Sequence, residues 1–103
     1  MRVIHKFSVG TREDTVHNLP RTATITHVDT MLNKDGRVGV SFWAMIDPEL
    51  PNDQRKFRVM ATGEYTADLV RPIGTALYGN VVLHLVELIG AEKPMPVGIG
   101  EEN

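Results

Sequence analysis

Cysteine is absent from this chain of 103 residues, which excludes disulfides, thiolate metal ligands and a cysteine nucleophile and suits a reducing compartment. Long apolar runs are absent too, since none approaches the roughly 20 residues of a membrane span. Met1–Val9 alternates with charged residues, so we expect no signal peptide. Basic excess is also missing: 11 Lys and Arg stand against 13 Asp and Glu, a formal net charge of −2. We therefore expect neither a membrane partner nor extended nucleic acid as the main partner.

What the chain does contain is β-branched residues, 12 Val, 6 Ile and 9 Thr. They fall in short alternating runs and not at helical spacing, which is typical of strands. We predict an all-β protein: a small antiparallel β-sandwich or barrel of about six to seven strands, with at most one short helical turn. The predicted domain covers residues 1–89, and residues 90–103 form an extended or flexible C-terminal tail.

Strands are predicted wherever apolar and polar residues alternate, with turns at Asn33–Gly36 and Tyr78–Asn80. Two prolines make residues 47–53 a loop, and residues 66–70 are left open between a loop and one helical turn. Both faces of the last strand are largely apolar, which predicts a central position. The predicted strands are Val3–Val9, Ala23–Leu32, Val38–Ile46, Lys56–Ala61, Ile73–Tyr78 and Val81–Leu88.

Catalytic and metal-binding patterns are weak. The four histidines are scattered, without a paired metal-ligand spacing, so we predict no metal and no cofactor. Ser8 and Ser41 lie within strand patterns and outside any nucleophile elbow. Asp47 and Glu49 follow a strand as turn residues do. We therefore do not expect an enzyme.

The basic residues of the chain are concentrated at Arg55, Lys56 and Arg58, with Arg37 and Arg71 as further members. Arg58 and Lys56 should project from a sheet face of the kind on which Trp43 stands. Arginine beside an aromatic ring can hold a base and a phosphate together. The alternative is a solvated face with salt bridges to Glu49, Asp53 or Glu64. The predicted ligand-contact residues are Trp43, Arg55, Arg58, Thr62, Thr75 and Tyr78.

Short motifs spread over residues 3–88 carry a family resemblance. They are His5-Lys6-Phe7, Phe42-Trp43-Ala44-Met45-Ile46-Asp47-Pro48, Arg55-Lys56-Phe57-Arg58-Val59, Ala61-Thr62-Gly63, Ile73-Gly74-Thr75 and Val82-Leu83-His84-Leu85-Val86-Glu87. In order and spacing they resemble an uncharacterised family, a domain of unknown function, of short proteins from bacteriophages and their bacterial hosts. The resemblance implies a bacteriophage setting and transfers no catalytic residues.

Together these observations favour a phage-encoded, non-catalytic binding protein in the host cytoplasm. As a counter-defence protein it would sequester a nucleotide-type small molecule or block a host protein. The alternative is a structural component of the virion that decorates or stabilises the capsid.

A surplus of apolar side chains predicts a homo-oligomer. Trp43, Met45 and Met60 lie opposite the expected core faces, and the tail adds Met95, Val97 and Ile99. The alternative is a monomer with a disordered tail.

Overall fold

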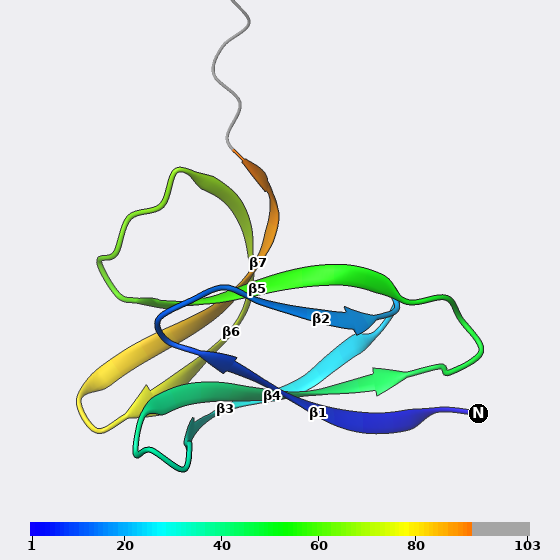
Figure 1. Cartoon of the computed structure of the whole chain (residues 1–103), viewed down its shortest axis with the longest axis horizontal. Helices are drawn as coiled ribbons and strands as arrows, with labels where there is room; N and C mark the ends of the chain where they lie inside the picture. The colour runs from blue at the N-terminus through cyan, green and yellow to red at the C-terminus, as the bar shows by residue number, and fades with distance from the viewer. Residues whose placement is uncertain (92–103) are drawn as a thin grey trace, which may run out of the picture.

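The computed structural model describes residues 1–91, and in this range the chain forms seven β-strands and no helix. The strands follow one another through short turns and loops (Figure 1). Their bounds are β1 Val3–Gly10, β2 Thr15–Leu19, β3 Thr24–Leu32, β4 Val38–Ile46, β5 Asp53–Ala61, β6 Asp68–Tyr78 and β7 Val81–Ala91.

The strands form two antiparallel sheets. One has three strands in the order β1-β4-β3, and the other has four in the order β2-β5-β7-β6. The hairpin between β3 and β4 turns on Asn33, whose Oδ1 accepts the amide N–H groups of Asp35 and Arg37. Gly36 has a φ of 75° there, a conformation that glycine adopts without strain. The Asp-Gly sequence therefore closes this hairpin as predicted.

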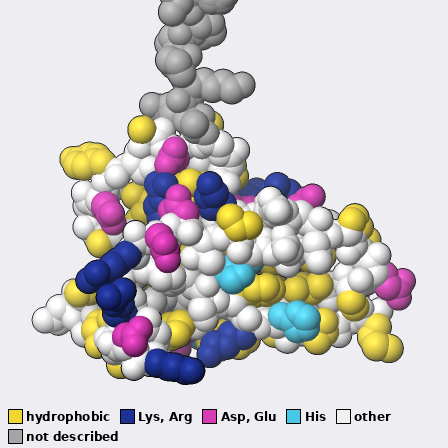
Figure 2. Space-filling model, viewed as in Figure 1, with side chains coloured by type: hydrophobic (Ala, Val, Ile, Leu, Met, Phe, Trp, Pro, Cys, Tyr) yellow, Lys and Arg dark blue, Asp and Glu magenta, His cyan; other side chains and the backbone are white. Residues whose placement is uncertain are grey.

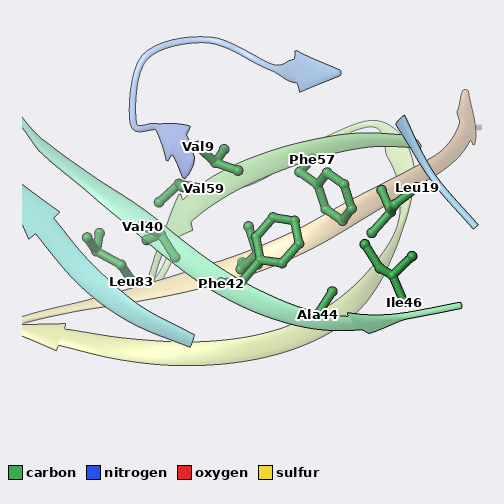
Figure 3. Packing of buried hydrophobic residues seen from close by; sticks show 10 residues of the cluster. Val9, Leu19, Val40, Phe42, Ala44, Ile46, Phe57, Val59 and Leu83 are labelled. Atoms are coloured by element: carbon green, nitrogen blue, oxygen red, sulfur yellow. The ribbon is translucent and has the colours of Figure 1, made fainter. Parts of the chain in front are cut away.

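The core lies between the two sheets and is built by the inward residues of alternating strands. Phe42 of β4 meets Phe57 of β5 across the sandwich, with ring centroids 4.8 Å apart. Figure 3 shows these rings pointing toward one another between the two sheets. The buried cluster comprises Val9, Leu19, Val40, Phe42, Ala44, Ile46, Phe57, Val59, Leu83 and Leu85.

Side chains also tie the two sheets together at both pairs of edge strands. His17 Nε2 of β2 lies 2.8 Å from the carbonyl oxygen of Ser8 in β1. At the other edge, Thr30 Oγ1 of β3 donates to the carbonyl oxygen of Leu77 in β6 at 3.0 Å. The sandwich is therefore linked on both sides, which brings it close to a barrel.

The all-β prediction is confirmed, and so is the central position of β7, which lies between β5 and β6. Three details differ. Sequence alternation missed β2, which is short and contains His17 and Asn18. Residues 68–70, left open between a loop and a helical turn, belong to β6, which begins at Asp68 and not at the predicted Ile73. The loop after β4 ends earlier than predicted, since β5 begins at Asp53.

The C-terminal boundary also differs from the prediction. Strand β7 continues to Ala91, two residues beyond the predicted domain end at residue 89, and pairs there with Asp68 of β6. The rest of the predicted tail, residues 92–103 with Met95, Val97 and Ile99, lies outside the described residues.

Candidate functional site

The predicted contact residues do not form a single surface. Trp43 lies on the outer face of the three-stranded sheet. Arg58 and Thr75 lie on the outer face of the four-stranded sheet. Arg55 points into the interior, with 4% of its surface exposed. Tyr78 ends β6 at the turn into β7. The residues therefore belong to four separate environments.

Trp43 is half-buried by its cross-strand neighbours and not by arginine. Lys6 Nζ lies 5.5 Å from the centre of its ring, and the ring of His27 lies 5.4 Å away. Lys6 and His27 pair with Trp43 from the two flanking strands. Side chains of the same sheet therefore cover part of the Trp43 ring.

Arg55 is bound in an interior ion pair. Its Nε and Nη2 atoms both donate to the carboxylate of Glu87 at 2.8 Å, and its Nη1 donates to the carbonyl oxygen of Pro20 at 3.0 Å. Glu87 is 1% exposed. Arg55 shares the inward side of β5 with Phe57 and Val59, and this shared parity is the sequence signal that would have placed it inside. All three of its guanidinium nitrogens donate to protein acceptors.

Two further arginines reach the same carboxylate. Arg71 Nη2 donates to Glu87 Oε1 at 2.6 Å, and Arg21 Nη1 approaches Glu87 Oε2 at 3.4 Å. Burial by itself would raise the pKa of Glu87, but hydrogen bonds and positive charge from Arg55 and Arg71 outweigh it and lower the pKa to about 2. Glu87 therefore stays ionised at neutral pH.

Arg58 is held on the outer face by two carboxylates. It donates to both oxygens of Asp14, at 2.7 and 2.9 Å, to Asp68 at 2.8 Å and to Thr66 at 2.8 Å. The salt-bridged alternative of the sequence analysis therefore describes this arginine, although the partners are Asp14 and Asp68. Its charge is already compensated, which weakens its attraction for an anionic ligand.

Thr62 and Thr75 share one partner. The Oγ1 of Thr62 lies 2.8 Å from Nε2 of His84, and the Oγ1 of Thr75 lies 3.1 Å from Nδ1 of the same ring. Both ring nitrogens thus have hydroxyl partners. This geometry connects β6, β7 and the end of β5, and it gives His84 a fixed orientation.

A hollow of about 220 Å³ lies where the end of β1, the β1–β2 loop and the β3–β4 hairpin meet. We call it the hairpin hollow. Val9, Met31 and Val38 give it apolar lining, and Gly10 and Gly39, paired across β1 and β4, add backbone without side chains. It is lined by Ser8, Val9, Gly10, Thr11, Arg12, Glu13, Met31, Asn33, Arg37, Val38 and Gly39.

Two arginines, Arg12 and Arg37, belong to the lining of this hollow. Both line it and both are exposed, and neither forms a salt bridge with any of residues 1–91. Figure 2 shows several Lys and Arg side chains at the lower left of the face, the region where Figure 1 places the β3–β4 hairpin. Arg12 was not among the predicted residues, because only the fold brings it beside Arg37.

Other site types find no support in the described part of the chain. Within residues 1–91, no three His, Cys, Asp or Glu side chains are grouped so that they could hold a metal ion. None of the described residues forms a helix that could cross a membrane. The hairpin hollow is therefore the candidate binding site.

Comparison with known proteins adds a family. A family model described as a domain of unknown function, DUF7352, matches residues 1–95. No curated protein and no solved structure matched the chain. The match covers the whole described fold and confirms the expectation of a family of unknown function. The chain thus belongs to the DUF7352 family.

Proposed function

We propose that the protein is a non-catalytic binding protein that captures a nucleotide-type small molecule in the hairpin hollow. One observation carries the proposal. Arg12 and Arg37 line the hairpin hollow, together with one acidic residue, Glu13, and form no salt bridge with any described residue, whereas Arg55 and Arg58 are each paired with carboxylates.

The chemistry of the lining fits the two parts of a nucleotide. Met31 and Val38, both half-buried, offer apolar contacts to a planar base. Guanidinium groups bind phosphate oxygens through paired, charge-assisted hydrogen bonds, which favours Arg12 and Arg37 for the phosphate. The volume of about 220 Å³ is below the roughly 300–1,000 Å³ of drug-sized sites. A hollow of this size holds part of a mononucleotide and leaves the rest of it at the surface.

The biological setting that we propose is a bacteriophage, with the protein acting in the host cytoplasm as a counter-defence protein. This setting rests on the motif resemblance. Blocking of a host protein is the related possibility, and a structural role in the virion is the alternative. Mass spectra of purified phage particles separate the two settings, because a virion component is present in them and a cytoplasmic binding protein is not.

Calorimetry with AMP, GMP, CMP and UMP tests the proposed site. We expect at least one of them to bind, and Arg12→Gln and Arg37→Gln each to weaken that binding by about tenfold, since a charged hydrogen bond contributes roughly 1.5–3 kcal/mol. Lys34→Gln is the matched control, because Lys34 belongs to the same hairpin and does not line the hollow. Absence of binding by all four at millimolar concentration, or an equal loss in the control, would overturn the proposal.

A further inference from the structure

The β1–β2 loop, residues 11–14, is a wall between two hollows. Thr11, Arg12 and Glu13 line the hairpin hollow and also a second hollow of about 360 Å³. The second hollow contains Arg58 and the exposed Tyr65 on its other side. The position of this loop therefore determines where Arg12 lies relative to the hairpin hollow.

Each end of the loop is fixed by a side chain. Thr11 Oγ1 donates to the carbonyl oxygen of Val38 at 3.1 Å. At the other end, Asp14 accepts two hydrogen bonds from Arg58, at 2.7 and 2.9 Å. A bidentate guanidinium–carboxylate pair restricts orientation as well as distance.

Arg58 itself is held from the opposite side. Asp68 and Thr66 each accept a hydrogen bond from it at 2.8 Å, and Asp68 belongs to β6. These two bonds fix the Arg58 guanidinium to the four-stranded sheet, in addition to its bonds to Asp14. Hydrogen bonding and positive charge from Arg58 lower the pKa of Asp14, so this carboxylate is ionised at neutral pH.

From this geometry we infer that Arg58 is a positioning residue for the hairpin hollow: it acts through Asp14 to hold the β1–β2 loop and with it Arg12. The inference rests on the proposed function of that hollow. It assigns to Arg58 a role one step removed from the ligand, in place of the direct contact expected from the sequence.

The test compares three variants of the full chain. Asp14→Asn and Arg58→Gln remove the tether, whereas the control Asp53→Asn removes a carboxylate from a separate surface salt bridge, with Arg21, and leaves the bonds of Arg58 intact. The first readout is the ¹⁵N order parameter of the Arg12 and Glu13 amides, which is about 0.85 for rigid backbone and below about 0.6 for flexible backbone. We expect a clear fall in Asp14→Asn and Arg58→Gln, and none in Asp53→Asn.

The second readout is the affinity for AMP, GMP, CMP and UMP. We expect about a fivefold loss in Asp14→Asn and Arg58→Gln, and less than twofold in Asp53→Asn. Unchanged order parameters in both tether variants overturn the inference, whatever the nucleotides do. It is also overturned if affinity stays constant in both tether variants while Arg12→Gln weakens it, and the proposed function then stands. Binding of no nucleotide to the unmodified chain overturns both.

Discussion

At the scale of residues, carboxylate partners separate the arginines of this protein into groups. Arg55 and Arg71 converge on Glu87, and Arg58 is bound by Asp14 and Asp68. Arg12 forms no salt bridge within residues 1–91. A paired guanidinium must lose its partner before it can bind an anion, whereas an unpaired one loses only water. Pairing therefore decides which arginines are available to a ligand.

The first residue-scale prediction concerns Glu87→Gln. The neutral amide leaves the buried Arg55 charge uncompensated. We therefore expect the free energy of unfolding to fall by about 3–5 kcal/mol. Urea denaturation measures the loss. Glu49→Gln, at an exposed loop position, is the control and should change stability little. An equally small effect of both variants would show that the interior ion pair is not structural.

The acid sensitivity of the fold is the second prediction. The pKa of Glu87 is about 2 in the folded chain against an ordinary value of 4.5, so the folded state favours the ionised form. Its contribution to stability is complete above pH 4.5 and is lost progressively as the pH falls toward 2. Urea midpoints measured between pH 6 and pH 2 should fall in that window. The Glu87→Gln chain should lack this part of the decline, and an identical decline would contradict the assignment.

At the scale of elements, strands β3 and β6 approach each other unusually closely. A Cβ atom at Gly74 would lie 2.7 Å from Cγ2 of Val28, closer than two carbon atoms can pack. The register of β6 against β7 also shifts between Pro72 and Gly74. The close packing of β3 against β6 therefore requires a residue without a side chain at position 74.

Gly74→Ala should accordingly destabilise the protein by about 1–3 kcal/mol, the usual effect of overpacking. Combining it with Val28→Ala should cost less than the sum of the two single changes, because the truncated side chain makes room for the new methyl group. Gly10→Ala is the control, since a Cβ there meets nothing within 4 Å. Strict additivity in thermal or urea unfolding would argue against the close contact.

At the scale of the whole molecule, apolar side chains remain on the outer face of the three-stranded sheet. Ile4 and Met45 lie opposite each other in β1 and β4, and both are exposed, at 52% and 37%. Strand β1 is also an edge strand. Exposed apolar neighbours beside a sheet edge favour association, so the homo-oligomer stays a prediction with this face as the interface that we expect.

Light scattering at micromolar concentration tests that assembly. We expect a mass that is a multiple of 11.5 kDa, and a shift toward the monomer in Ile4→Lys. Leu32→Lys is the matched control, because Leu32 is comparably exposed at the end of β3. A mass of 11.5 kDa for the unmodified chain would contradict the prediction, and equal dissociation of both variants would place the interface elsewhere.

Most of the fold could be predicted because strand alternation is a local property. The inward set of β4, with Val40, Phe42 and Ala44, is buried as its period-two pattern predicts. Strand β2 was not predicted, because its five residues include the polar His17 and Asn18. Pairing with β5 stabilises it as a strand. Likewise, the start of β6 at Asp68 depends on pairing with Ala91 of β7.

The all-β class, the hairpin turns and the main core faces can be predicted from the sequence, because they follow from the side-chain period of a strand and the backbone preferences of Asp-Gly. Which charges are paired depends instead on the tertiary structure. Arg55 and Glu87 are 32 positions apart, and Arg58 and Asp14 are 44 apart. These pairs form because strand register and sheet packing bring distant residues within hydrogen-bond distance. The same packing leaves Arg12 and Arg37 beside one hollow, because antiparallel pairing brings the end of β1 next to the start of β4.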